Sequence, residues 1–185
     1  AQWQSQFEAA GWQVLEAKYG RRLRAAFEEP GGEHLRAWID AMPNEQYQSL
    51  FALDGDALRA RFLEGAPAPV RDVVAGYDDR ELKPLVTDLG GHDIPALIDA
   101  FEQADAAQDR PSVLFAYTVK GWGLPIAGNP RNHSALLSGE QIDALRHSTG
   151  LSPADEWDRF DAASPAGILA NRRREALALP PRPRD

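Results

Sequence analysis

Residues 112–125 have the sequence Ser-Val-Leu-Phe-Ala-Tyr-Thr-Val-Lys-Gly-Trp-Gly-Leu-Pro, in which an apolar run passes directly into a glycine-rich turn. The apolar run predicts a β-strand over 112–119. Before it, residues 94–107 predict a helix, with Asp93 as the N-cap and an apolar face at helical spacing: Leu97, Ile98, Phe101 and Ala104. A helix followed by an apolar strand is the second half of a β-α-β unit. We therefore expect an α/β fold with a parallel, buried sheet.

The first half of the chain adds another strand and a series of short helices. Trp3 to Ala10 is typical of the end of a helix, which Gly11 breaks, and residues 12–17 alternate as a strand does. Helical patterns then follow over 21–29, 33–41, from 43 onward, 57–63 and 67–75, with a short turn at 78–82. We interpret the series as a helical excursion between two strands, and its aromatic residues as core: Trp38, Tyr47, Phe51 and Phe62.

The C-terminal part is less regular. Ser138 and Gln141 fit a capping box that opens a helix through His147, and 153–160 predicts one or two further helical turns. Residues 177–185 are rich in proline and predict a linker or disordered tail. The expected organisation is one domain over 1–176 followed by that tail.

A candidate site follows the predicted strand 112–119. In open parallel sheets, ligands bind beyond the carboxyl ends of the strands, where Lys120 to His133 would lie. His133 could transfer a proton near neutral pH from a glycine-rich loop that closes over a substrate, or it could be an ordinary surface histidine. Lys120 could neutralise a diphosphate or carboxylate, or it could be a solvated or ion-paired lysine.

Two further residues near this point carry open alternatives. Trp122 could wall a pocket or simply pack the turn. His92 follows Gly90 and Gly91, which permit close backbone approach or a positive φ. Its side chain could contact a ligand, or it could be a structural histidine bonded to a nearby carbonyl.

Composition excludes several classes of site. The 185-residue chain has a net charge of -8, which argues against a surface that binds a nucleic acid backbone. The absence of cysteine excludes disulfides, cysteine-ligated zinc and iron–sulfur clusters. His34 and His147 lie on predicted helices and lack partners at metal-ligand spacing, so we assign no metal ligand. No apolar run approaches the length of a membrane span.

Four segments in order resemble a known family. They are similar to segments of thiamine diphosphate-dependent enzymes, and are Phe7 to Val14, Gly90-Gly91-His92-Asp93, the strand with its Lys120-Gly-Trp-Gly turn, and Asn132-His133-Ser-Ala-Leu-Leu. The family is that of transketolase and the 2-oxo acid dehydrogenase E1 enzymes. Phe7 to Val14 is similar to homodimeric pyruvate dehydrogenase E1, whereas the loop from Asn132 is closer to transketolase and to E1 relatives outside the pyruvate type. The resemblance implies that the chain is the second half of the diphosphate-binding domain in a parallel-sheet thiamine diphosphate-binding fold.

The resemblance also implies roles for residues. His133 would be the catalytic histidine of a mobile loop, Lys120 and His92 would bind the cofactor, and Asn132 and Trp122 would belong to the substrate loop. The cofactors would be thiamine diphosphate and Mg2+. The Gly-Asp-Gly motif that holds them is expected in another segment or a companion chain, since Asp54-Gly55-Asp56 does not continue in the family pattern.

The leading hypothesis is therefore part of an E1-type enzyme that decarboxylates a 2-oxo acid and transfers the acyl unit to a lipoyl domain. One alternative is a transketolase-like transferase of two-carbon or acyl units, and another is a non-catalytic scaffold subunit. The expected partners are companion chains that carry the rest of a cytoplasmic, oligomeric enzyme, and a lipoyl-bearing E2; nucleic acid and membranes are not expected. The isolated chain is expected to be inactive.

Overall fold

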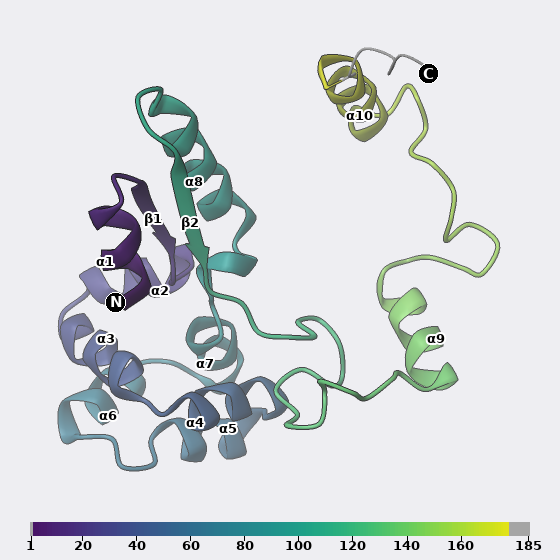
Figure 1. Cartoon of the computed structure of the whole chain (residues 1–185). Helices are drawn as coiled ribbons and strands as arrows, with labels where there is room; N and C mark the ends of the chain where they lie inside the picture. The colour runs from purple at the N-terminus through teal and green to yellow at the C-terminus, as the bar shows by residue number, and fades with distance from the viewer. Residues whose placement is uncertain (1, 178–185) are drawn as a thin grey trace. The chain divides into compact units, whose positions relative to one another are not determined.

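A computed structural model describes residues 2–177 of the chain, which divides into two compact units, Ala1–Leu136 and Leu137–Asp185 (Figure 1). The elements of the first unit are α1 (Gln2–Ala9), β1 (Gln13–Ala17), α2 (Arg21–Glu28), α3 (Gly32–Ala41), α4 (Asn44–Ser49), the 3-10 turn η1 (Leu50–Ala52), α5 (Gly55–Phe62), α6 (Ala68–Val74), α7 (Asp79–Val86), the 3-10 turn η2 (Gly90–His92), α8 (Ile94–Ala106) and β2 (Ser112–Ala116). The second unit contains α9 (Gly139–Ser148) and α10 (Pro165–Ala176).

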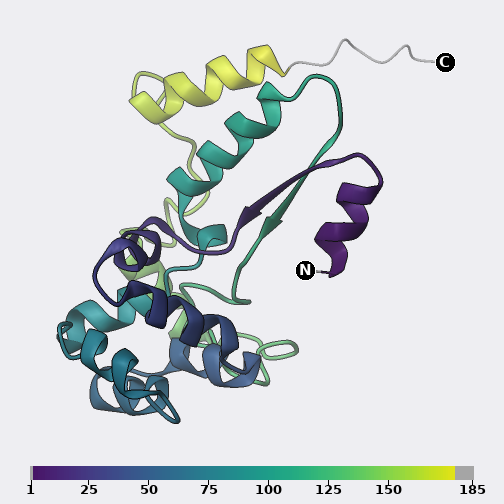
Figure 2. The ribbon, with the colours of Figure 1, turned by 90° about the vertical axis from the view of Figure 1, so that its left-hand side faces the viewer.

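The two strands form a parallel pair, as the sequence predicts. Gln13 of β1 faces Ser112 of β2, and the register continues to Ala17 opposite Ala116. Figure 2 shows α8 on one side of the pair and α1 on the other. The α/β fold class is confirmed.

The strands are shorter and less buried than expected. β2 ends at Ala116 rather than at residue 119, and most residues of both strands are only half-buried. Within residues 2–177 each strand has one strand neighbour, so each leaves an edge open. On α8 the small residues Ala96 and Ala100 are buried, whereas Ile98 and Phe101 of the predicted apolar face are exposed.

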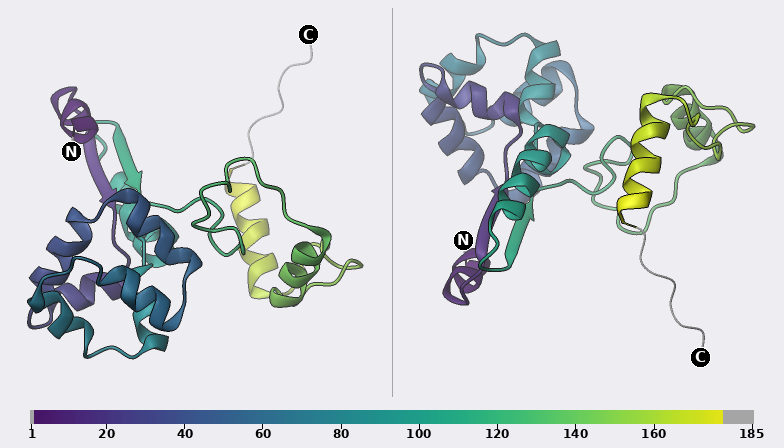
Figure 3. Two further views of the ribbon diagram at one scale, coloured as in Figure 1. Left: turned by 90° about the horizontal axis from the view of Figure 1, so that it is seen from below. Right: turned by 90° about the horizontal axis from the view of Figure 1, so that it is seen from above.

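The helices α2 to α7 gather beyond the carboxyl ends of the strands (Figures 1 and 3). They enclose the main hydrophobic core, in which Leu23, Leu35, Leu50 and Phe62 have no exposed surface. Trp38 and Tyr47 pack against this core, and the Tyr47 hydroxyl donates to the Val86 carbonyl at 2.8 Å. The excursion is therefore a helical cluster with a core of its own.

One expectation within the cluster is wrong. Instead of a short turn at 78–82, Asp78 is the N-cap of an eight-residue helix, α7, that runs from Asp79 to Val86. Asp78 and Glu81 form a capping box that starts the helix, and Leu82, Leu85 and Val86 are buried in the core. Pro84 lies inside the helix and removes one backbone hydrogen bond, but burial of these three side chains outweighs that loss.

The cluster begins and ends at the same place. Tyr19 and Leu89 form an antiparallel bridge, and the Gly20 N–H donates to the Asp88 carbonyl at 2.7 Å. The Asp88 carboxylate also accepts the N–H groups of Arg22 and Leu23, which satisfies donors at the start of α2. The chain thus leaves β1, builds the cluster, and returns to the strand ends at Leu89.

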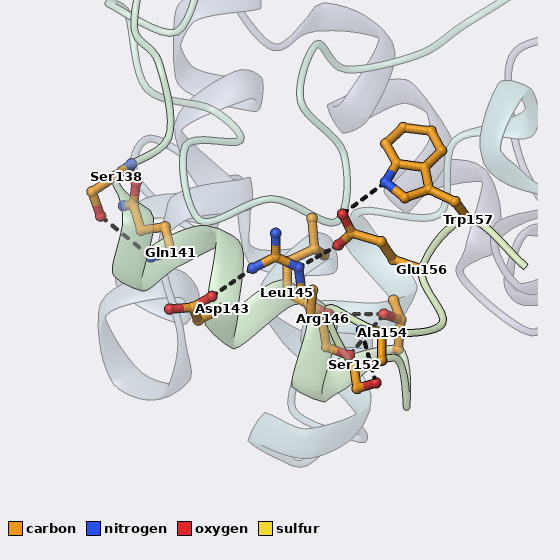
Figure 4. A network of polar contacts seen from close by, with 10 residues as sticks. Ser138, Gln141, Asp143, Leu145, Arg146, Ser152, Ala154, Glu156 and Trp157 are labelled. Atoms are coloured by element: carbon orange, nitrogen blue, oxygen red, sulfur yellow. Dashed lines mark hydrogen bonds and ion pairs between the residues drawn. The ribbon is translucent and has the colours of Figure 1, made fainter.

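The second unit rests on polar contacts. The predicted capping box of Ser138 and Gln141 starts α9, and Arg146 joins Asp143 and Glu156 (Figure 4). Trp157 donates its indole N–H to Glu156 at 2.9 Å. The expected helical turns at 153–160 are present in part: Glu156 N–H donates to the Ser152 carbonyl at 3.1 Å and Asp158 N–H to the Asp155 carbonyl at 2.9 Å, but the turns end at Trp157 and do not extend into a helix.

Two sequence predictions concern the end of the chain and its division. The proposed tail at 177–185 lies almost wholly outside the described residues, so it stays a prediction, as does the single domain over 1–176. Across the described part of the chain, every helix is too short or too polar to cross a membrane.

Candidate active site

The candidate site lies at the carboxyl end of β2, where the structure brings together the five residues that the sequence singled out. They are His92, Lys120, Trp122, Asn132 and His133. The strand ends at Ala116, the buried Val119 anchors the turn, and Gly121 and Gly123 adopt positive φ angles of 74° and 77°. These glycines let the chain turn back so that Asn132 and His133 return to Lys120.

Lys120 and His133 form the central pair. The Lys120 Nζ lies 3.2 Å from His133 Nδ1 and donates to the His133 carbonyl at 2.9 Å. An ammonium has donors only, so His133 Nδ1 acts as the acceptor and the ring proton is on Nε2. Both side chains are exposed, so the pair can meet a ligand.

Asn132 fixes the backbone of the same turn. Its amide Nδ2 donates to the Lys120 carbonyl at 3.0 Å. Lys120 is therefore held at its carbonyl by Asn132 and at its ammonium by His133. These contacts close the loop 121–134 upon its own starting point.

His92 and Trp122 form a stacked pair beside the turn. Their ring centroids are 4.7 Å apart and the rings are inclined by 10°. His92 Nε2 accepts the Val119 N–H at 2.9 Å. The structural alternative for His92 anticipated a bond to a carbonyl, but the bond is to a backbone N–H. Partial burial lowers the pKa of His92 below its usual value.

Two glycines explain how His92 reaches this position. A Cβ on Gly90 would lie 2.6 Å from the Ala17 backbone, and one on Gly91 would lie 2.5 Å from the Tyr117 carbonyl oxygen. The Gly91 N–H donates to that same Tyr117 carbonyl at 2.9 Å. Of the two reasons considered for this glycine pair, close backbone approach is the one that applies. Neither glycine has a positive φ.

The helical cluster supports the far side of the loop. Gly128 has a φ of 73°, and a Cβ there would lie 2.4 Å from the Gln48 carbonyl and 3.2 Å from Phe51 Cβ. Ala127 beside it is buried. The excursion thus forms a surface on which the loop rests.

A second polar group lies at the carboxyl end of β1, and sequence analysis missed it. Asp40 of α3 accepts from both Lys18 Nζ and the Tyr19 hydroxyl, and Lys18 lies 5.6 Å from the centre of the Tyr117 ring. A cavity of about 270 Å³ is lined by Lys18, Tyr19 and Asp40 together with Glu16, Arg24 and Arg36. The signal available was the position of Lys18 and Tyr19 directly after a strand; nothing in the sequence pointed to Asp40.

The charges in this second group influence one another. Partial burial acts to lower the pKa of Lys18, but hydrogen bonds to Asp40 and Tyr19 outweigh it and the pKa is raised. Burial acts to raise the pKa of Asp40, and the bonds from Lys18 and Tyr19 reverse this, so that pKa is lowered. The ionised pair is therefore favoured at neutral pH.

A metal site was not assigned from the sequence. In residues 2–177, no group of three or more histidine and acidic side chains is arranged to hold a metal ion. His34 and His147 lie on α3 and α9, as expected.

Comparison with known proteins gives the family to which the chain belongs. Residues 70–163 match the family described as "Transketolase, thiamine diphosphate binding domain". The match covers half of the chain, and the chain belongs to this family of thiamine diphosphate-dependent enzymes.

Several relatives of the chain are pyruvate dehydrogenase E1 components. The chain is 27% identical over 141 residues to the pyruvate dehydrogenase E1 component of Escherichia coli K12, which covers 76% of this chain and 16% of the relative. It is 30% identical over 156 residues to that of Corynebacterium glutamicum, covering 83% and 17%. The E1 component of Cupriavidus necator matches at 26% over 199 residues, covering 96% and 22%. The chain thus spans about a fifth or less of most of these relatives.

Proposed function

We propose that this chain forms part of a thiamine diphosphate-dependent E1-type 2-oxo acid dehydrogenase, which decarboxylates a 2-oxo acid and passes the acyl unit to a lipoyl group. The observation that carries the proposal is the Lys120–His133 pair at the carboxyl end of β2. Its support is the family membership of residues 70–163 and the similarity to pyruvate dehydrogenase E1 components.

His133 is the proton-transfer group in this proposal. Lys120 donates to Nδ1, so Nε2 carries the ring proton and is the nitrogen free to exchange a proton with a substrate. His133 is exposed and follows a loop that contains Gly121, Gly123 and Gly128, so its ring can approach a ligand bound at the strand end.

Lys120 supplies positive charge where anionic groups would gather. An ammonium at a strand end offsets the charge of a diphosphate or a substrate carboxylate. Thiamine diphosphate, when bound, supplies the electron sink that decarboxylation requires. Lys120 suits the anionic diphosphate of this cofactor. His92 lies beside the same turn, and Asn132 and Trp122 lie on the loop.

Magnesium ligands must come from elsewhere in the enzyme under this proposal, since the described residues offer no suitable group. Companion segments or chains would carry them and complete the open edges of the strand pair. The proposal therefore includes an oligomeric, cytoplasmic enzyme that works with a lipoyl-bearing E2, and an isolated chain without activity.

Native mass spectrometry tests the assembly. The chain is expected to travel with companion polypeptides, and the complex is expected to gain the mass of thiamine diphosphate when the cofactor and Mg2+ are added. A complete complex that gains no cofactor mass contradicts the proposal.

Substitutions in the complete enzyme test the chemistry. His133→Gln should lower kcat/KM for 2-oxo acid decarboxylation by about 100-fold or more, the usual scale of a lost proton-transfer group. Lys120→Met should also lower kcat/KM, because it removes the positive charge that offsets the anionic groups. His147→Gln, on the exposed surface of α9, is the matched control and should leave the rate unchanged. If kcat/KM is unchanged by both substitutions, the chain is a scaffold subunit. If a two-carbon unit is transferred without release of CO2, the enzyme is transketolase-like. Either result refutes the E1 proposal.

A further inference from the structure

We propose that His92 is a positioning residue, whose neutral ring holds the turn after β2 in the arrangement that brings Lys120 to His133. The inference rests on the proposed function only for the catalytic use of that pair. The positioning itself is a property of this chain and can be tested without cofactor or substrate.

His92 contacts the chain on both sides of Lys120. Its Nε2 accepts the N–H of Val119, the residue before Lys120, at 2.9 Å. Its ring face stacks on Trp122, two residues after Lys120. One imidazole therefore restrains the entry and the exit of the turn that carries the ammonium.

His92 is itself held on a firm base. The η2 turn is joined to both strand ends, because Gly90 N–H donates to the Lys18 carbonyl at 3.0 Å and Gly91 N–H to the Tyr117 carbonyl at 2.9 Å. The next residue, Asp93, accepts from Arg21 N–H at 2.7 Å and from Ala96 N–H at 3.3 Å. A side chain held in this way can fix the position of the turn that it contacts.

The restraint continues into the loop. Asn132 donates to the Lys120 carbonyl, and Lys120 Nζ donates to the His133 carbonyl. A shift of Val119 would move the Lys120 backbone and change the distance from Nζ to His133 Nδ1. Proton transfer depends on hydrogen-bond distances, so such a shift would affect the reaction.

The contact with Val119 requires one protonation state. A ring nitrogen accepts a hydrogen bond only when it carries no proton, so His92 must be neutral with its proton on Nδ1. Protonation of Nε2 would set two donors against each other. Burial lowers the pKa of His92, which keeps the ring neutral at pH 7.

Charged groups surround this ring from several elements. Those that line the cavity beside it are Arg21 and Arg22 of α2, Asp88 before η2, and Asp93 after it. Lys120 belongs to the turn that His92 contacts at Val119 and Trp122. The Arg21 guanidinium forms an ion pair with Asp93, whereas the contact of Arg22 with Asp88 is made by its backbone N–H.

NMR of the full 185-residue chain tests the proposal. The ring nitrogen shifts of His92 should show the Nδ1–H form at pH 7.5, and the Val119 amide should be protected from exchange. In His92→Phe, which keeps an aromatic ring against Trp122 but removes the acceptor, Val119 protection should fall about tenfold and the His133 resonances should shift. His34→Phe, on the exposed surface of α3, should change neither.

The outcomes are separate from those of the proposed function. An Nε2–H ring at His92 in the wild-type chain, or full Val119 protection in His92→Phe, overturns the positioning role, and the first result needs no variant to fold. In the complete enzyme, His92→Phe should lower kcat by up to about 100-fold with little change in KM. Failure of the E1 assay with confirmed Nδ1–H and Val119 results would leave the positioning role standing and refute only the activity.

Discussion

Substitution of Gly91 by alanine should disrupt the junction on which the site is built. The added Cβ would lie 2.5 Å from the Tyr117 carbonyl oxygen, 2.6 Å from Thr118 Cγ2 and 2.9 Å from the Tyr117 carbonyl carbon. Two of these three atoms belong to the backbone, which cannot rotate out of the way. The chain after β2 must therefore move by several tenths of an ångström or more.

The cost has two parts. Overpacking of this kind destabilises by about 1–3 kcal/mol, and the hydrogen bond from Gly91 N–H to Tyr117, worth about 1 kcal/mol, would be strained or lost. We expect the free energy of unfolding of the first unit to fall by about 2–4 kcal/mol. Because Val119 follows Tyr117 closely, its hydrogen bond to His92 should also weaken.

Urea unfolding measures the global effect, and amide exchange of Val119 measures the local one. Gly76→Ala is the control in the same unit, because its nearest new neighbour would be the Val73 carbonyl at 3.4 Å, an ordinary contact. The control should lie within about 0.5 kcal/mol of wild type. If Gly91→Ala matches the control in stability and in Val119 exchange, the close approach does not constrain the site and the reasoning is refuted.

Three further predictions concern the supporting structure. Phe62→Ala should lower the free energy of unfolding by about 3–5 kcal/mol, because the side chain is fully buried in the helical core, and urea midpoints near wild type would contradict this. Asp78→Ala should cost about 0.5–2 kcal/mol and speed amide exchange at Glu81, since it removes the capping box; unchanged exchange would show that α7 needs no cap. The lowered pKa of Asp40 makes its contribution to stability complete above its unfolded value of about 3.9 and lost as pH falls through the folded value. Asp40→Asn should remove that acid-range dependence in urea titrations, and an unchanged pH profile would mean that the contact with Lys18 does not stabilise the fold.

Local sequence patterns predicted many of the helices correctly. The helix behind Asp93 and the capping box of Ser138 are confirmed, because both depend on bonds between residues three positions apart. The helix after Asp78 was predicted only as a short turn, because its length depends on contacts with distant residues. Whether a helix continues through Pro84 depends on what Leu85 and Val86 can bury, and the rest of the core decides that.

The site shows the same division. The position of Lys120 after a strand and of His133 in a glycine-rich loop pointed to a shared site, and the structure places them in contact. Their catalytic and cofactor-binding roles stay predictions. The partnership of Lys18 with Asp40 had no counterpart in the sequence pattern, since a helix of the excursion brings Asp40 to the strand end.

The sequence by itself determined the kinds of element, their order along the chain and the loop that carries the candidate catalytic residues. Periodicity, caps and glycines act over a few residues, so they can be recognised in the sequence alone. Only the tertiary structure decided that Gly91 meets Tyr117, that His92 accepts from Val119, and that Gly128 rests on the helical cluster. Such contacts join residues far apart in the chain, and their geometry follows from how the helices pack rather than from any local preference.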